Sequence, residues 1–306
     1  MSDETVLVTG ASGLIGQRLL TRLVEEGRRA IGIDMAAKPG HQPVEIVDLG
    51  DIHRLHTIAA RENVTSVVHC GAVSGPMVMI DNPYGIVRAN VVGTANVVEL
   101  ARVRRMRRLV FCSSTSAYGP THEPPEGSRG VPEEAPLRPS SVYGATKVAG
   151  EQLLSGYRAQ HGLDAVAIRL SWVYGPGRTT DCVIRTMIED AQAGRPTRLT
   201  FGRDFPRQFI HVDDAVDALL RAHDAPTCPQ AVYTATGDSC LTIGEIADVV
   251  RTVLPQADIE VAPGADPLDD HQHRFDTSAI ACDLGFEPRQ TLEAGIRSYA
   301  QWLASC

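Results

Sequence analysis

Short runs of apolar residues alternate with amphipathic helical patterns through the first half of the chain. A helical pattern that begins near Gly13 places Leu19, Leu20 and Leu23 on one side and stops at Gly27. This alternation is typical of right-handed βαβ units and predicts an α/β fold with a doubly wound parallel sheet. The predicted strands cover 6–9, 30–33, 44–47, 66–69, 109–112 and 165–170.

The alternation ends near Leu170, and this change predicts two domains. The larger domain is expected to comprise residues 1–170 and a returning segment at about 205–224. A smaller, discontinuous substrate-binding domain is expected to comprise residues 171–204 and 225–306.

Two further segments have a clear local pattern. The segment from Thr121 to Pro139 contains five prolines, which exclude a helix there and predict an irregular loop that forms one wall of the substrate site. Beyond the loop at Gly175-Pro176-Gly177, a helix is expected from about Thr180 to Ala193.

Charge and cysteine content narrow the possible functions. The net charge of −8 gives no electrostatic reason to bind a polyanion, so nucleic acid is not an expected partner. The five arginines at 102, 104, 105, 107 and 108 are a local exception, explained either by cations at a helix C-terminus or by a docking patch for an acidic partner. The seven scattered cysteines lack metal-ligand spacing, so we expect no metal site and reduced thiols in a cytoplasmic protein.

No membrane association is expected from the sequence. The acidic start, Met1 to Thr5, leaves no room for a signal peptide before the first predicted strand. No apolar run approaches the roughly 20 residues that a membrane-spanning helix needs.

Gly10, Gly13 and Gly16 have the spacing of a dinucleotide-binding turn and lie between a predicted strand and a predicted helix. Gly10 allows a tight turn, Gly13 lets the backbone approach a pyrophosphate, and Gly16 lets the helix pack closely on the strand. A flexible turn that merely needs glycine has the same spacing. With Leu14 and Ile15 between them, these residues predict the cofactor site of a Rossmann-type domain.

Two acidic residues follow the next predicted strands. Asp34 lies some 20 residues beyond the glycines, where a carboxylate accepts hydrogen bonds from an adenosine ribose and repels a 2′-phosphate. No arginine closely follows Asp34, although Lys38 is near, so NAD is favoured over NADP. Asp48 and Leu49 are expected to meet the adenine, although Asp48 also suits a loop cap.

Tyr143 and Lys147 are four residues apart on a predicted helix, so their side chains project from the same face. An ammonium group beside a phenol stabilises the phenolate, which suits acid–base catalysis. Asn90, by contrast, occupies a predicted helix where an amide is unfavourable unless it ties neighbouring backbone together. Asn90 therefore either braces the backbone or contacts the cofactor directly.

Together these residues resemble the extended short-chain dehydrogenases/reductases, and within them the NAD-dependent sugar-nucleotide epimerases and dehydratases. The resemblance covers nearly the whole chain. Its motifs are Thr9-Gly10-x-x-Gly13-x-x-Gly16, Asp34, Asp48-Leu49, His69-Cys70-Gly71-Ala72, Asn90, Ser113-Ser114-x-x-x-Tyr118-Gly119, Tyr143-x-x-x-Lys147, the run from Arg169 to Gly177, and the run from Arg207 to Asp214.

The resemblance implies that Ser114, Tyr143 and Lys147 form the catalytic group. Tyr143 would remove the proton of a substrate hydroxyl as hydride leaves the same carbon for the nicotinamide. Lys147 would hold the ribose hydroxyls, and Ser114 would hydrogen-bond the reacting oxygen. The remaining contacts that the resemblance implies are Ala72, Asn90 and Ser171 with the cofactor and Ser74 with the substrate.

The two residues after Ser114 help to identify the reaction. Family members that eliminate water carry Asp-Glu at this place, and the nucleotide-sugar decarboxylases usually have a glutamate where Ser116 stands, whereas this chain has Thr115-Ser116. Neither side chain is a strong acid or base. What remains is reversible oxidation at one carbon, which describes either an epimerase or a dehydrogenase.

Three residues bear on the substrate. Arg207 matches the family's arginine for the nucleotide part of the substrate, and a guanidinium suits phosphate. Trp172 stands where the nucleotide-sugar enzymes usually have an asparagine, so it either shortens the pocket for a smaller sugar acid or turns into the core. Arg274 lies where relatives supply another cation, although a surface salt bridge is an equal alternative.

The leading hypothesis is an NAD-dependent nucleotide-sugar epimerase. The alternative is an NAD-dependent dehydrogenase of a small non-nucleotide sugar, sugar acid or hydroxy acid. A third hypothesis, an NAD(H)-sensing binding protein, is disfavoured because both Tyr143 and Lys147 are present. By resemblance, the helices at about 84–104 and 141–161 would pair with their copies in a homodimer.

Overall fold

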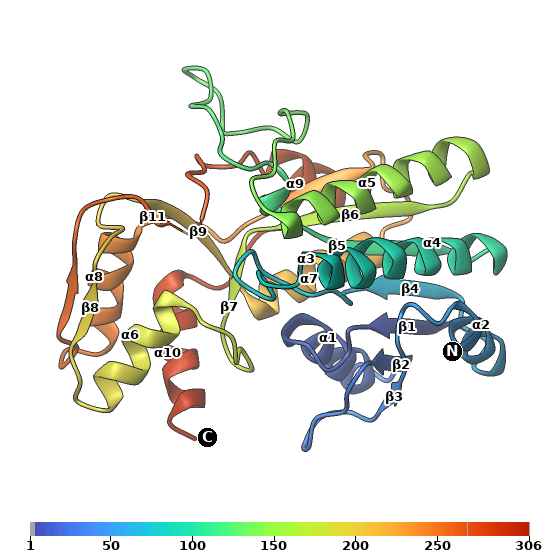
Figure 1. Ribbon diagram of the computed structural model, residues 1–306, viewed down its shortest axis with the longest axis horizontal. Coiled ribbons are helices and arrows are strands. Elements are labelled where there is room, and N and C mark those ends of the chain that lie inside the picture. Colours follow the sequence, from blue (N-terminus) through green and yellow to red (C-terminus); the bar gives the residue numbers. More distant parts are fainter. Residues whose placement is uncertain (1–3, 268, 306) are drawn as a thin grey trace.

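The computed structural model describes residues 4–267 and 269–305, and its larger part is a seven-stranded sheet (Figure 1). The strand order is β10-β6-β5-β4-β1-β2-β3, and each pairing in the sheet is parallel. The predicted α/β fold with a doubly wound sheet is confirmed, with all six predicted strands present. The strands are β1 Thr5–Thr9, β2 Arg29–Asp34, β3 Val44–Ile46, β4 Ser66–His69, β5 Arg108–Ser114, β6 Ala165–Leu170 and β10 Val232–Ala235.

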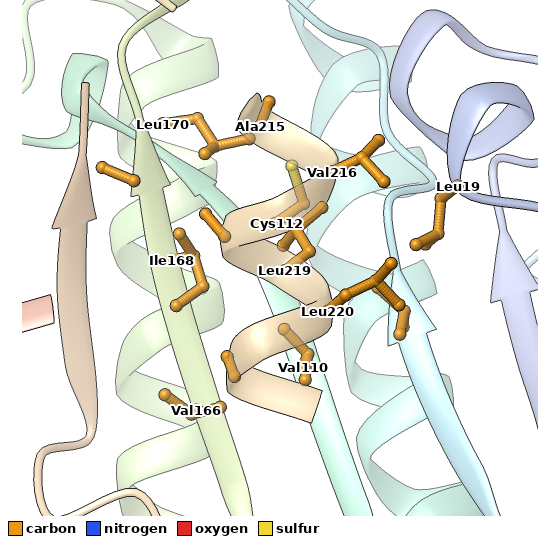
Figure 2. Close-up of a cluster of buried hydrophobic side chains, with 14 of the residues drawn as sticks. Leu19, Val110, Cys112, Val166, Ile168, Leu170, Ala215, Val216, Leu219 and Leu220 are labelled. Carbon is orange, nitrogen blue, oxygen red and sulfur yellow. The ribbon is translucent and has the colours of Figure 1, made fainter. Parts of the chain in front are cut away.

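Helices cover both faces of this sheet because successive strand residues point to opposite sides. Val110 and Cys112 pack on one face, and Leu109 and Phe111 pack on the other. Figure 2 shows one of these interfaces, where α7 lies across β5 and β6. The helices on that face are α1 Leu14–Glu25, α7 Val212–Asp224 and α9 Ser278–Leu284, and those on the other are α2 Ile52–Arg61, α4 Gly93–Val103 and α5 Val142–His161.

A buried ion pair joins α5 to the sheet. Arg169 on β6 contacts Glu151 on α5 at 2.7 Å, with side-chain exposures of only 4% and 2%. Ser113 on β5 donates a second hydrogen bond to the same carboxylate at 2.5 Å, and the Arg169 guanidinium lies 4.5 Å from the centroid of the Tyr118 ring. The pair therefore holds the middle of α5 against the strands that end at the site.

The smaller part of the protein lies beside one end of the large sheet (Figure 1). It has its own apolar core, in which α6, α8 and α10 pack together. The helix expected at 180–193 is α6. The elements are β7 Trp172–Tyr174, β8 Thr197–Leu199, β9 Pro206–His211, β11 Cys240–Thr242 and β12 Ile259–Val261, with α6 Val183–Gln192, α8 Ile243–Val253 and α10 Leu292–Leu303.

The expected domain boundaries need a correction at two places. β10 and α9 belong to the large sheet and its core, although both fall within the range 225–306 that was expected to form the smaller domain. β9, from the expected returning segment, instead pairs with β7 and β11 in a three-stranded sheet. The division into a cofactor-binding and a substrate-binding domain stays a prediction.

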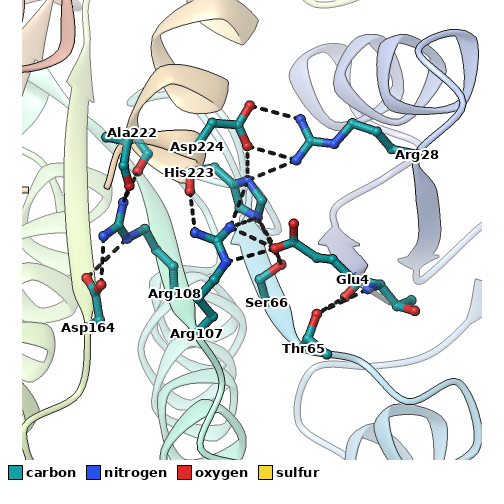
Figure 3. Close-up of polar contacts among 12 residues, drawn as sticks. Glu4, Arg28, Thr65, Ser66, Arg107, Arg108, Asp164, Ala222, His223 and Asp224 are labelled. Atoms are coloured by element: carbon teal, nitrogen blue, oxygen red, sulfur yellow. Dashed lines mark hydrogen bonds and ion pairs between the residues drawn. The ribbon is translucent and has the colours of Figure 1, made fainter. Parts of the chain in front are cut away.

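Arg107 and Arg108 tie the start of β5 to the end of α7 (Figure 3). Arg108 is buried, pairs with Asp164 at 2.7 Å and donates to the backbone carbonyl of Ala222 at 2.9 Å. Arg107 pairs with Glu4 at 2.7 Å and donates to the carbonyl of His223 at 3.0 Å. These two arginines of the cluster therefore have intramolecular partners, which argues against a docking patch centred on them.

The structure also bears on membrane spans, cysteine pairing and metal sites. Within residues 4–267 and 269–305, no helix combines the length and the apolar character that a membrane span requires. The six cysteines in those ranges are free thiols, and no group of three or more His, Cys, Asp and Glu in them is arranged to hold a metal. Cys306 and the first three residues, Met1 to Asp3, lie outside the described residues.

Candidate active site

A cavity of about 510 Å³ runs along the carboxyl ends of the strands from β2 to β6. In doubly wound sheets this edge is where ligands bind. The structure brings most of the predicted site residues together there. The predicted residues that line the cavity are Gly10, Gly13, Leu14, Ile15, Gly16, Asp34, Asp48, Leu49, Ala72, Ser74, Ser114, Tyr143, Lys147, Ser171 and Trp172.

The glycine turn between β1 and α1 has a steric requirement for glycine at two positions. Gly10 has a φ of +65°, and a Cβ atom there would lie 2.7 Å from the backbone nitrogen of Gly71. A Cβ atom on Gly16 would overlap the carbonyl oxygen of Gly10. Gly13 is the N-cap of α1 and offers no capping side chain. The start of α1 is therefore open toward the cavity, as an anion-binding helix terminus requires.

The Asp34 carboxylate ends β2 and is held by backbone donors. It accepts from the N–H of Ser12 at 2.8 Å and from the N–H of Met35 at 2.7 Å. A carboxylate has about four acceptor positions, so two remain for the hydroxyls of a ribose. Asp48 accepts from the N–H of Gly50 at 2.8 Å and also lines the cavity, so it is a loop cap beside the expected adenine position.

Asn90 is not among the residues that line the cavity, and its hydrogen bonds are those of a brace. Direct contact of Asn90 with the cofactor stays a prediction. It lies in a π-helical turn, Arg88–Val92, and is buried. Its side-chain oxygen accepts from the N–H of Val73 at 2.8 Å, and its nitrogen donates to Thr146 Oγ1 at 3.0 Å. Asn90 thus braces the loop after β4 against α5, one residue before Lys147.

Ser114 and Tyr143 reach the cavity from two different elements. Ser114 is the last residue of β5, and its Oγ accepts from the N–H of Ser116 at 3.1 Å. Tyr143 is in the first turn of α5, which Ser141 caps by accepting from the N–H of Gly144 at 3.0 Å. The helix start packs directly on the segment after Ser114, because a Cβ atom on Gly144 would overlap the carbonyl oxygen of Ser116.

Lys147 supplies a positive charge beside the Tyr143 ring. Its Nζ donates to the carbonyl oxygen of Cys112 at 2.7 Å and lies 5.6 Å from the centroid of the Tyr143 ring. The pKa of the nearby His69 is lowered to about 3, because burial and the Lys147 charge both disfavour the imidazolium. His69 is therefore neutral, and the ammonium of Lys147 is positioned to stabilise a phenolate.

Arg207 is not among the residues that line the cavity, although its guanidinium stacks on Trp172, which does line it. The role of Arg207 in substrate binding stays a prediction. Its guanidinium pairs with Asp266 at 2.5 Å and with Asp269 at 2.8 Å, and its side chain is only 5% exposed. Burial raises the pKa of Asp269 to about 6, although Arg207 opposes this rise. The Trp172 ring lies on the guanidinium, with 4.7 Å from its centroid to the Arg207 Cζ. Arg207 is thus neutralised and covered.

Two more arginines differ in their relation to the cavity, and the role of Arg274 stays a prediction. Arg274 is exposed and does not line the cavity. Arg178, directly after the predicted Gly175-Pro176-Gly177 turn, is buried and does line it. An arginine beside a glycine-rich loop at the end of the sheet was the signal available in the sequence.

The residues present fit an NAD molecule. The glycine turn admits a close approach of backbone and pyrophosphate, and Asp34 keeps free acceptor positions for a ribose. At the other end of the cavity, Ser171 Oγ is buried and has no hydrogen-bond partner in the described part of the chain. An unpaired buried hydroxyl is costly, and a polar group of a bound cofactor would satisfy it.

Comparison with known proteins identifies the family. Residues 6–233 match the model of the NAD dependent epimerase/dehydratase family. The chain belongs to this family. The predicted resemblance to the extended short-chain dehydrogenases/reductases is thereby confirmed, as is the prediction of an NAD-dependent enzyme.

Family members with related sequences and structures span nearly the full chain. The UDP-glucose 4-epimerase of Mycolicibacterium smegmatis is 30% identical over 305 residues, covering 95% of each chain. MoeE5 in complex with UDP-glucuronic acid and NAD superimposes with a TM-score of 0.87 at 27% identity, covering 99% of each chain. The Thermus thermophilus UDP-glucose 4-epimerase in complex with NAD has a TM-score of 0.85 at 27% identity, covering 98% of this chain and 99% of the other.

Proposed function

We propose that this protein is an NAD-dependent epimerase that inverts a secondary hydroxyl of a nucleotide sugar. One observation carries the proposal: Ser114, Tyr143 and Lys147 lie in the same cavity as the glycine turn and Asp34. Acid–base and cofactor-binding groups thus face a single space. The names of the family members above, UDP-glucose 4-epimerases and a protein bound to UDP-glucuronic acid, support a nucleotide sugar as the substrate.

Each catalytic residue has a role that its position supports. Tyr143 removes the proton from the substrate hydroxyl and returns one to the carbonyl oxygen during reduction. Lys147 stabilises the phenolate and binds the ribose hydroxyls, and Ser114 donates a hydrogen bond to the reacting oxygen. Bound NAD supplies the hydride acceptor. The burial of Tyr143 and Lys147 excludes bulk water from the proton transfer.

The product distinguishes this proposal from a net oxidation. Purified protein is incubated with NAD and UDP-glucose or UDP-glucuronic acid, and the sugar isomers are separated chromatographically while absorbance of NADH is followed. We expect a 4-epimer to accumulate without NADH in proportion to it. NADH formed one-for-one with substrate consumed would contradict an epimerase.

A specific observation favours a second candidate, a dehydrogenase of a small sugar acid or hydroxy acid. Arg207, which the family resemblance assigns to the nucleotide, is paired with Asp266 and Asp269 and covered by Trp172. A substrate without a nucleotide would not need this guanidinium. For this candidate, free sugar acids would produce NADH stoichiometrically and UDP-sugars would remain unchanged.

We also propose a homodimer formed through the helices around α4 and α5. Apolar side chains are exposed along this region, with Tyr84 72%, Val92 47% and Val103 49% exposed. Exposed apolar residues in a group are typical of an interface. Sedimentation analysis is expected to give a dimer, and Val92→Asp is expected to give a monomer. The cytoplasmic location stays a prediction.

A further inference from the structure

Two guanidinium groups that differ in their charge environment lie close to the indole ring of Trp172. The Cζ of Arg207 lies 4.7 Å from the centroid of the indole, and the Cζ of Arg178 lies 5.7 Å from it. Trp172 and Arg178 line the cavity, and Arg207 does not. Arg207 has two carboxylate partners, so its charge is more than balanced.

Among the residues that the structure describes, the charge of Arg178 has no carboxylate partner of this kind. The residue is only 9% exposed. Its guanidinium donates to the carbonyl oxygens of Val173 at 2.5 Å, Asp181 at 2.8 Å and Thr180 at 3.4 Å. Across residues 4–267 and 269–305, no carboxylate lies within 4.0 Å of it. A buried cation without a counter-charge is costly, so an anion in the cavity would complete its environment.

The guanidinium is also held in place with donors to spare. Three of its five N–H groups are used by the three carbonyl oxygens, which leaves two. The backbone carbonyl of Arg178 accepts from the Tyr299 hydroxyl at 3.1 Å, which anchors the loop to α10. A fixed, planar group with two free donors suits the oxygens of a carboxylate or phosphate.

The location relates Arg178 to the catalytic residues. Ser114 at the end of β5 is in register with Leu170 at the end of β6. Ser171 and Trp172, which follow Leu170, therefore lie at the same edge of the sheet as Ser114. Arg178 follows six residues after Trp172 on the loop that leaves β7. Its place against the indole puts it on the wall that a substrate bound at Ser114 and Tyr143 would face.

We propose that Arg178, together with the indole of Trp172, forms the subsite for an anionic group of the substrate, a carboxylate or a phosphate. This subsite replaces Arg207, whose guanidinium is occupied by Asp266 and Asp269. The inference rests on the proposed function in that the substrate occupies the cavity beside Tyr143. It assigns substrate recognition to a residue of the loop after β7.

The test compares Arg178→Gln and Arg178→Lys with the unaltered protein, each loaded with NAD. Calorimetry measures dissociation constants for UDP, UDP-glucose, UDP-glucuronic acid and free D-glucuronate. Loss of a charge-assisted hydrogen bond is expected to weaken anion binding by roughly 10-fold or more in Arg178→Gln, and Arg178→Lys is expected to retain part of the affinity. Arg297→Gln, a surface arginine paired with Glu293 on α10, is the matched control.

The probes separate the two sources of the anion. If Arg178 binds a carboxylate, Arg178→Gln weakens only UDP-glucuronic acid and D-glucuronate. If it binds a phosphate, UDP, UDP-glucose and UDP-glucuronic acid weaken together. Equal dissociation constants for all probes in Arg178→Gln and the unaltered protein, or equal losses in Arg297→Gln, would overturn the proposal.

Two controls keep this result separate from folding and from the proposed function. The first is a measurement of NAD binding and of the thermal midpoint for each variant. If Arg178→Gln does not fold, Arg178→Lys decides the outcome. Anion binding by Arg178→Lys that equals that of the unaltered protein, with the same response to salt, would count against the subsite. Turnover is assayed independently. If Arg178→Gln selectively loses anion binding but the unaltered protein epimerises nothing, the epimerase is refuted and the subsite is retained. If the unaltered protein turns substrate over but Arg178→Gln binds anions normally, the subsite is refuted and the epimerase is retained.

Discussion

Gly144 lies so close to Ser116 that a Cβ atom added to Gly144 would overlap the Ser116 carbonyl oxygen. Tyr143, the neighbour of Gly144, therefore reaches the cavity only because α5 packs on the segment that follows Ser114. We expect Gly144→Ala to push the two apart and lower kcat by about 10-fold or more, since small displacements of catalytic groups are costly. Steady-state kinetics of the purified variant measure this effect.

Gly156 on the same helix is the matched control. A Cβ atom there would meet nothing within 4 Å. We expect Gly156→Ala to keep activity and to stabilise the protein by about 0.4–1 kcal/mol, because alanine loses less conformational entropy on folding. Equal losses of kcat in both variants would show that the packing of Gly144 is irrelevant to catalysis.

Replacing Tyr143 with Phe removes the proposed proton-transfer group and little else. General acid–base catalysis contributes about 10²- to 10⁴-fold, so we expect kcat to fall by that factor while NAD still binds. Tyr157→Phe, also on α5 but bonded to Glu99, is the control and is expected to stay active. Full activity of Tyr143→Phe would show that another group transfers the proton. If neither the unaltered protein nor Tyr143→Phe turns substrate over and both bind NAD equally, the result would favour an NAD(H) sensor.

Asp34→Ala tests the preference for NAD. The carboxylate faces the cavity and has acceptor positions left after its two backbone contacts. Its removal is expected to weaken NAD binding by about 10-fold, the loss of a hydrogen bond to a charged group, and to weaken NADP binding less or not at all. Fluorescence titration with both cofactors measures the ratio. An unchanged NAD:NADP ratio would mean that another residue selects the cofactor.

His69 is expected to contribute to the loss of stability in acid. It is buried between the hydroxyls of Thr9 and Thr94, and its pKa is lowered to about 3, chiefly by burial. Between pH 6.5 and about 3 the unfolded chain takes up a proton at this side chain that the folded protein does not. The favourable contribution is complete above pH 6.5 and is lost as the pH falls, by about 1.4 kcal/mol per pH unit and about 5 kcal/mol in all.

Urea unfolding between pH 4 and 8 measures this contribution. His69→Gln, which retains a polar group between the two threonines, is expected to be less stable at pH 8 and to show a flatter fall in the free energy of unfolding below pH 6.5. The same slope in both proteins would assign the acid sensitivity to other groups.

The buried pair of Arg169 and Glu151 is expected to be essential for stability. Arg169→Met leaves a carboxylate buried without its partner, so we expect a loss of about 3–5 kcal/mol in the free energy of unfolding. Arg195, paired with Asp190 at the surface, provides the comparison, and Arg195→Met is expected to cost less than about 1 kcal/mol. Urea unfolding that gave similar losses for both would contradict the difference in burial.

The sequence predicted those features that depend on local spacing. The glycine turn, the six strands and the spacing of Tyr143 and Lys147 follow from the conformational needs of a strand, a tight turn and a helix face. β10 was missed because four residues carry too little periodicity to identify a strand, and its pairing with β6 is set by the tertiary fold.

The substrate end of the cavity was harder to predict. The partners of Arg207 lie 59 and 62 positions away along the chain, so no local pattern announces them. Asn90 showed the opposite situation: an amide in a helix predicted a brace, and its bonds to Val73 and Thr146 account for it. Residue type therefore identified the kind of interaction, and the fold determined the partner.

The position of β10 has a consequence for biosynthesis. This strand pairs with β6 and forms the edge of the large sheet. It follows β6 by about 60 residues, and these residues build much of the smaller part of the protein. While the chain is being made, β6 has an open edge until Val232–Ala235 have left the ribosome. An uncovered strand edge pairs readily with other chains, so premature termination before residue 232 would yield a fragment prone to aggregate.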